Sequence, residues 1–186
     1  MNPKALYRTI IEQFRSPQSS VTNFISTSPQ PIAMLVKVIM PLLAISFIFN
    51  FLCRFIWEIG NTSNLTIITS QVLPIVIAQF TTILISSIIL NKLLSSIVGN
   101  SNYKQSLYWV EYASLPMFTT NIVACILYQL SAMITCFGLY SLFILWQIIK
   151  SKQPNLSRTN IFKIVFSFIL MLLSYTMTLN LCKTLL

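Results

Sequence analysis

The sequence predicts an all-α integral membrane protein with five transmembrane helices, preceded by a short amphipathic interfacial helix. Hydrophobic residues make up 55% of the chain, charged residues only 8%, and the mean hydropathy is +0.77. Charge-free runs of 33 residues between Glu58 and Lys92, and of 38 residues between Glu111 and Lys150, exceed the roughly 20 apolar residues that cross a bilayer. The short loops between the apolar runs alternate between rich and poor in Lys and Arg, as in polytopic membrane proteins.

The first element is an amphipathic helix predicted over Pro3 to Arg15. Its apolar residues recur every four positions, at Leu6, Ile10 and Phe14, and Ser16-Pro17 ends it. Such a helix either lies in the headgroup plane or packs on the bundle's own loops, and its pattern fits both. Residues 1–31 therefore form a cytoplasmic helix and linker, and residues 32–186 the bundle.

The bundle is divided into five spans by length. The first, second and last apolar runs cover residues 33–53, 69–90 and 164–182. Residues 106–149 would make one helix of about 66 Å, twice the hydrocarbon thickness. We therefore divide them near Gln129 and Leu130 into spans 106–128 and 131–149.

The distribution of positive charge supports five spans with the N-terminus inside. In this topology ten of the 12 Lys and Arg residues lie on the cytoplasmic side, and only Arg54 and Lys183 lie outside. A four-span chain would divide them seven to five. We expect a cell membrane location, most simply a bacterial inner membrane, with the C-terminus outside.

The chain lacks most of the residue types that catalytic and metal sites use. The chain has no His and no Asp, and Glu12, Glu58 and Glu111 lie on separate segments. A Ser-His-Asp triad and a paired-carboxylate mechanism both lack parts. The four cysteines are far apart in sequence and have no C-x-x-C spacing, so thiol zinc ligation is disfavoured. We expect no enzyme activity, no catalytic or metal site and no cofactor.

The net charge of +9 is explained by topology and by attraction to anionic headgroups, and no soluble basic domain indicates nucleic-acid binding. The expected partners are the lipid bilayer and a membrane protein or second copy of this chain. The candidate lipid or partner surface comprises the basic residues of the first helix and of the fourth loop: Lys4, Arg8, Arg15, Lys150, Lys152, Arg158 and Lys163.

Prolines within spans one and three suggest a second candidate site. Pro41 frees the carbonyl of Lys37, and Pro116 frees that of Tyr112. Lys37 and Glu111 lie at similar depths, about 6 and 7.5 Å into their spans. We hypothesise that these opposite charges pair, because charges within a membrane tend to find each other.

The segment Glu111-Tyr112-Ala113-Ser114-Leu115-Pro116, followed by a tight hairpin into a span ending in Trp146-Gln147-Ile148-Ile149, resembles the Yip (Ypt-interacting protein) domain family. Met40-Pro41-Leu42-Leu43 in the first span is similar to bacterial members. The Asp-Leu-Tyr-Gly-Pro element of eukaryotic members is absent, and Glu111 replaces a frequent Gly. The resemblance implies a five-helix bundle with a cytoplasmic N-terminus, and only Tyr112 and Pro116 correspond to the motif.

These observations predict a non-enzymatic scaffold or adaptor of the Yip-domain type. The alternative is a small-solute or ion translocator, because the span centres carry polar side chains that either line a path or hydrogen-bond between helices. These are Gln79, Ser86, Ser87, Asn121, Thr135 and Gln147.

Overall fold

The computed structural model describes residues 3–25, 30–58, 65–99, 101–127 and 130–185, and every regular element within these ranges is a helix. The predicted all-α fold is therefore confirmed. The elements are α1 (Pro3–Arg15), α2 (Pro17–Ile25), α3 (Pro31–Met34), the π-helical turn η1 (Leu35–Ile39), α4 (Met40–Glu58), α5 (Leu65–Val98), α6 (Tyr103–Ile126), α7 (Ser131–Cys136), the 3-10 turn η3 (Phe137–Leu139), α8 (Tyr140–Lys152) and α9 (Arg158–Leu185).

Three helices of the described chain are long and apolar enough to cross a membrane, covering Pro31–Ile56, Ile67–Val98 and Arg158–Thr184. They contain the predicted spans 33–53, 69–90 and 164–182 and extend beyond each of them. A chain with these helices is compatible with a multi-pass membrane protein.

The remaining two predicted spans are helical but differ from this group. The predicted span 106–128 lies mostly in α6, whose more polar first half includes Lys104 and Glu111. The predicted span 131–149 is not one helix, because the 3-10 turn η3 at Gly138 separates α7 from α8. Residues 106–149 are not one helix, as we expected, since α6 ends at Ile126 and α7 begins at Ser131. Gln129, near which we placed the division, is outside the described residues.

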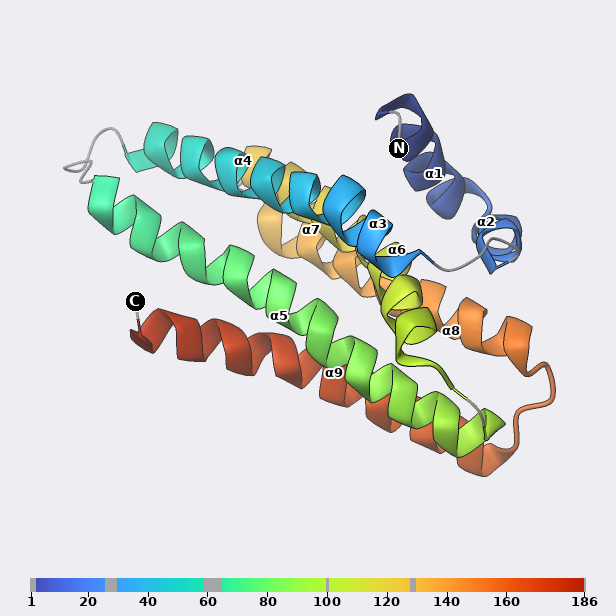
Figure 1. Cartoon of the computed structure of the whole chain (residues 1–186). Helices are drawn as coiled ribbons and strands as arrows, with labels where there is room; N and C mark the ends of the chain where they lie inside the picture. Colours follow the sequence, from blue (N-terminus) through green and yellow to red (C-terminus); the bar gives the residue numbers. More distant parts are fainter. Residues whose placement is uncertain (1–2, 26–29, 59–64, 100, 128–129, 186) are drawn as a thin grey trace.

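The long helices run in alternating directions between two ends of an elongated bundle (Figure 1). At one end Arg54, near the end of α4, donates a hydrogen bond to Gln71 near the start of α5. At the other end Lys163 of α9 donates to the Ser96 hydroxyl of α5 at 2.8 Å. The contacts thus fix which helix ends lie together.

α6 is the central helix of the bundle. It packs against α1, α3, α4, α5, α7 and α8, and all residues from Trp109 to Pro116 are buried. By contrast α9 packs mainly along α5, and large apolar side chains such as Phe162, Phe166 and Met177 face outward. An apolar outer face of this size is what a lipid-facing helix presents.

The end of α5 is set by one glycine and the start of α6 by one asparagine. Gly99 has a φ of +83°, and its amide donates to the Ser95 carbonyl at 3.2 Å. A positive φ is disfavoured for residues with a Cβ, which explains glycine here. Asn102 caps α6, because its side chain accepts a hydrogen bond from the Lys104 amide at 3.0 Å.

The helical prolines act locally. Ahead of Pro41 the backbone adopts the π-helical turn η1, in which the Met40 amide donates to the Leu35 carbonyl, a common local adjustment around missing helical hydrogen bonds. Pro116 lies buried inside α6, and Pro74 inside α5 is a third helical proline that our sequence analysis did not single out.

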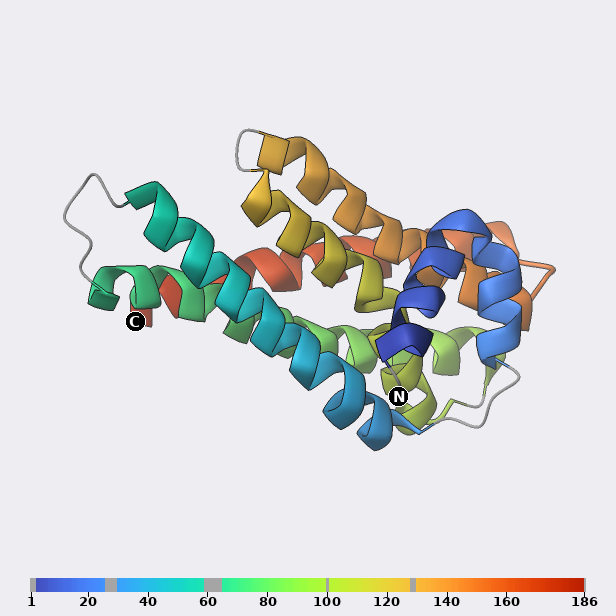
Figure 2. The same cartoon turned by 90° about the horizontal axis from the view of Figure 1, so that it is seen from above.

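α1 has the bounds that the sequence predicts, but the stretch after it differs from the expected linker. Residues Pro17–Ile25 form α2, which packs on α8 (Figure 2). Pro at the first position suits a helix start, and burial of Val21 and Ser20 holds α2 against the bundle. The two N-terminal helices therefore form a hairpin on α6 and α8.

Candidate functional site

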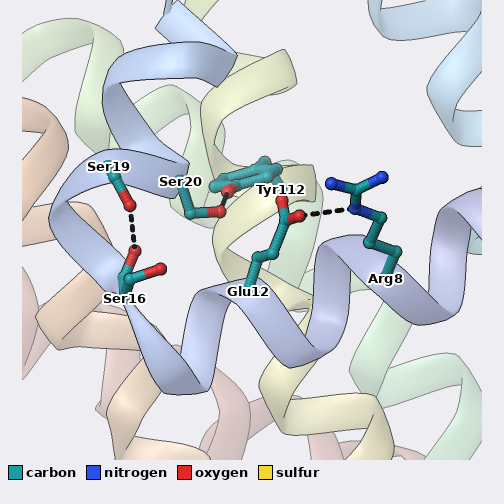
Figure 3. A network of polar contacts seen from close by, with 6 residues as sticks. All are labelled: Arg8, Glu12, Ser16, Ser19, Ser20 and Tyr112. Carbon is teal, nitrogen blue, oxygen red and sulfur yellow. Dashed lines mark hydrogen bonds and ion pairs between the residues drawn. The ribbon is translucent and has the colours of Figure 1, made fainter.

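The N-terminal hairpin is attached to the bundle at Tyr112, the tyrosine of the family-like motif. Tyr112 is buried in α6, and its hydroxyl lies 2.5 Å from the Ser20 hydroxyl of α2 (Figure 3). Its ring stacks on that of Phe24, with centroids 3.7 Å apart. Tyr112 thus binds α2 through both its ring and its hydroxyl.

Gln13 makes the corresponding attachment for α1. Its side-chain amide donates to the Tyr112 backbone carbonyl at 2.9 Å, and its backbone carbonyl accepts from the Tyr140 hydroxyl at 2.8 Å. Gln13 is fully buried, and the ring of its neighbour Phe14 stacks on Tyr140 at 5.2 Å. α1 is therefore held between α6 and α8.

The corner between α1 and α2 is stabilised locally. The Ser19 hydroxyl donates to the Ser16 carbonyl at 3.1 Å, and Arg8 pairs with Glu12 at 2.8 Å on the exposed side of α1 (Figure 3). Ion pairs of this i, i+4 kind contribute only a few tenths of a kcal/mol. The hairpin is held chiefly by its buried contacts with Tyr112 and Tyr140.

The predicted ion pair between Lys37 and Glu111 is not formed. Glu111 is fully buried, and neither carboxylate oxygen has a hydrogen-bond partner, whereas Lys37 is exposed on η1 and lies beside Tyr108 in a shallow surface pocket. Similar depth along two helices was the wrong criterion, because pairing also requires the two side chains to face one another.

Four of the seven basic candidate residues, Lys150, Lys152, Arg158 and Lys163, lie where α8 ends and α9 begins, and the other three lie on α1. Lys152 lies 5.7 Å from the centre of the Trp109 ring of α6, and Lys163 bonds Ser96 of α5. Lys150 and Arg158 are exposed, as are Arg8 and Arg15 of α1; the Lys4 side chain lies outside those that the structure describes.

Sequence reasoning missed four residues of this attachment: Gln13, Ser20, Phe24 and Tyr140. One signal was present, because Gln13 lies three positions after Ile10 and so shares the apolar face of the helix. A polar residue within an apolar stripe marks a buried contact. The others lie in segments whose composition carries no such signal.

The described chain is thus an all-helical protein, compatible with a multi-pass membrane protein, whose N-terminal hairpin is fastened to its central helix. No protein-family model, curated protein or solved structure matches it. The resemblance to Yip-domain proteins therefore depends on the motif residues themselves.

Proposed function

We propose that this chain is a five-span membrane protein of the Yip-domain type that acts as a non-enzymatic scaffold or adaptor. In this proposal α6 and the α7, η3 and α8 segment form spans three and four, and the N-terminal hairpin lies on the cytoplasmic side of a bacterial inner membrane. The observation that carries the proposal is the attachment of this hairpin to the motif residue Tyr112.

The helix directions support five crossings. α4, α5, α6, the α7 to α8 segment and α9 alternate in direction between the same two ends (Figure 1). A chain with this path has its first and last residues on opposite sides of the membrane. α6 and η3 also lie side by side, since a Cβ on Gly138 of η3 would lie in van der Waals contact with the Thr120 hydroxyl of α6, at 3.4 Å.

The charges support the assignment of the cytoplasmic side. The end that contains Lys152, Lys163 and the N-terminal hairpin carries most of the basic residues, and the other end carries Arg54 and Lys183. This asymmetry is the one expected for a cytoplasmic face.

The adaptor role follows from what the attached hairpin leaves exposed. Tyr7 and Ile11 of α1 are 68% and 41% exposed and lie one helical turn apart, next to Arg8. Fixing these side chains in place removes the conformational entropy that a free peptide would lose on binding. The hairpin thus presents a rigid mixed apolar and basic surface to a membrane-protein partner at the cytoplasmic face.

The adaptor role is tested by photo-crosslinking in intact membranes. A photoreactive amino acid at Tyr7 should give a discrete protein adduct, whereas one at Phe162, 74% exposed on α9, should react with lipid. Absence of a protein adduct from both position 7 and position 11 would contradict the role. Protein-dependent flux of ions or solutes into reconstituted vesicles would favour the translocator instead.

The basic surface is tested by lipid retention. Protein purified from vesicles of phosphatidylethanolamine and phosphatidylglycerol should carry less phosphatidylglycerol after neutralisation of four positions, Lys150, Lys152, Arg158 and Lys163, to Gln. A control variant neutralises the two basic residues of the other end, Arg54 and Lys183, and should leave retention unchanged. Equal phosphatidylglycerol retention by the two variants would contradict a role for this surface in lipid binding.

A further inference from the structure

A pocket of about 220 Å³ opens at the basic end of the bundle, between α5, α6 and α8. Its lining includes Leu94 and Val98 at the end of α5, Gln105 and Trp109 in the first turns of α6, and Lys152 at the end of α8. The accessible lining is polar and apolar in similar parts. An engineered cavity of about 150 Å³ holds benzene, so this pocket has room for a phosphate group and the carbons next to it.

Lys152 gives the pocket a positive charge. Its ammonium lies 5.7 Å from the centre of the Trp109 ring, a cation–π contact that favours one position of this long side chain. No carboxylate is among the described lining residues, and the one ion pair of the described chain joins Arg8 to Glu12. The charge of Lys152 is therefore not neutralised by the described protein, and the pocket attracts an anion.

The pocket also offers hydrogen-bond donors that the protein does not use. The Ser101 hydroxyl is already occupied, because it donates to the Asn91 carbonyl at 2.9 Å. By contrast the half-buried Gln105 side chain makes no hydrogen bond within the described chain, and Lys152 is exposed. An ammonium donates three hydrogens, and a glutamine amide donates two and accepts at its oxygen. Together they match an anionic oxygen with a hydroxyl group nearby.

The position of the pocket indicates that the anion comes from a lipid. Val98 is the last residue of a helix long and apolar enough to cross a membrane, and its side chain is 49% exposed. The pocket thus opens where a membrane span ends, which is the level of the lipid headgroups. Tryptophan and lysine side chains are typical of this level. The apolar wall at Leu94 and Val98 suits the first carbons of acyl chains, which a free phosphate lacks.

We propose that this pocket is a binding site for the headgroup of an anionic, hydroxylated phospholipid of the phosphatidylglycerol class. Lys152 pairs with the phosphodiester, Gln105 bonds a headgroup hydroxyl, and Val98 contacts the start of an acyl chain. Phosphatidylethanolamine carries an ammonium that Lys152 repels, so it binds less well. The inference rests on the membrane placement of the proposed function, and it narrows the basic surface to one site that includes the uncharged Gln105.

The test titrates phosphatidylglycerol or phosphatidylethanolamine into the full chain in detergent and counts bound lipids by native mass spectrometry. We expect one phosphatidylglycerol to bind more tightly than later ones and more tightly than phosphatidylethanolamine. Lys152→Gln should weaken this first binding about tenfold, because it removes a charged hydrogen bond. The matched control Lys150→Gln removes the same charge at an exposed lysine of α8 that does not line the pocket, and it should leave the first binding unchanged.

Two further variants separate recognition from folding, with the thermal unfolding midpoint recorded for each. Lys152→Arg should retain the lipid, because a guanidinium also stacks on indole and binds phosphate. Gln105→Leu keeps every charge and should weaken the first binding about threefold.

Three results would overturn the proposal. Equal affinities for the two lipids would remove the selectivity for an anion. Equal losses in Lys150→Gln and Lys152→Gln would mean that lipid binds the basic surface diffusely, which leaves the proposed function in place and removes the pocket. Displacement of the bound lipid by millimolar glycerol 3-phosphate would assign the pocket to free phosphate esters. The membrane topology has a separate readout, the accessibility of single cysteines in cells.

Discussion

The hydroxyl groups of Tyr112 and Ser20 lie 2.5 Å apart although the two residues are 92 positions apart in sequence. Both side chains are buried. The contact joins the central helix α6 to α2, and the same tyrosine contacts α1 through its carbonyl. One residue of the bundle thus orients both helices of the N-terminal hairpin.

Tyr112→Phe should loosen the hairpin without unfolding the bundle. The change leaves the ring stack on Phe24 but removes the bond to Ser20, which we expect to cost about 1 kcal/mol. The detached fraction of the hairpin should then rise about fivefold, seen as faster tryptic cleavage after Arg15. Tyr103→Phe, at an exposed tyrosine of α6, is the control. Equal cleavage rates in the two variants would show that the Ser20 contact does not hold the hairpin.

Tyr140→Phe should release α1 more than α2. The Tyr140 hydroxyl bonds the Gln13 carbonyl of α1, and α2 keeps its contacts with Tyr112. Amide hydrogen exchange should therefore accelerate in α1 and stay nearly constant in α2. Tyr112→Phe should show a larger effect in α2. The same exchange pattern in both variants would mean that the hairpin opens only as one unit.

The two described glycines should respond differently to alanine. Gly99→Ala forces a Cβ into a positive φ and should destabilise the protein by about 1 kcal/mol, although open space surrounds the position. Gly138→Ala places its Cβ at 3.4 Å from Thr120 without such a backbone conflict and should stay within about 0.5 kcal/mol. Denaturation midpoints compare the two. A larger loss of stability for Gly138→Ala than for Gly99→Ala would contradict this prediction.

Lys37 and Glu111 should behave as independent residues. Lys37→Met removes an exposed charge and should change stability by less than about 0.5 kcal/mol. Glu111→Gln replaces a buried carboxylate that has no hydrogen-bond partner and should not destabilise the protein. In a double-mutant cycle the coupling energy should stay below about 0.5 kcal/mol. A coupling energy above about 1 kcal/mol would instead indicate that the two residues form an ion pair.

Sequence patterns were sufficient to predict features that depend on a single helix, such as its limits and its length. The limits of α1 follow from its four-residue spacing and Ser16-Pro17, and the break between α6 and α7 follows from the excess length of residues 106–149. The three long apolar helices follow from composition. Each of these depends on local preference or on length alone.

Features that depend on two elements were not predicted. α2 has only nine residues in a largely polar segment, and it is held by Val21, Ser20 and Phe24 against the bundle. The turn η3 interrupts a charge-free run at Gly138. The rotation of each helix about its axis decides whether Glu111 and Lys37 can pair, and the one-dimensional sequence does not contain that rotation.

The central claim is that the chain crosses the membrane five times and leaves its ends on opposite faces. It is tested most directly with single-cysteine variants Arg15→Cys and Lys183→Cys, made after the four native cysteines are replaced by alanine, and labelled in intact bacterial cells with a membrane-impermeant maleimide. We predict that Lys183→Cys is labelled in intact cells and Arg15→Cys only after permeabilisation. Labelling of both positions from the same side would contradict the five-span topology and the cytoplasmic hairpin together.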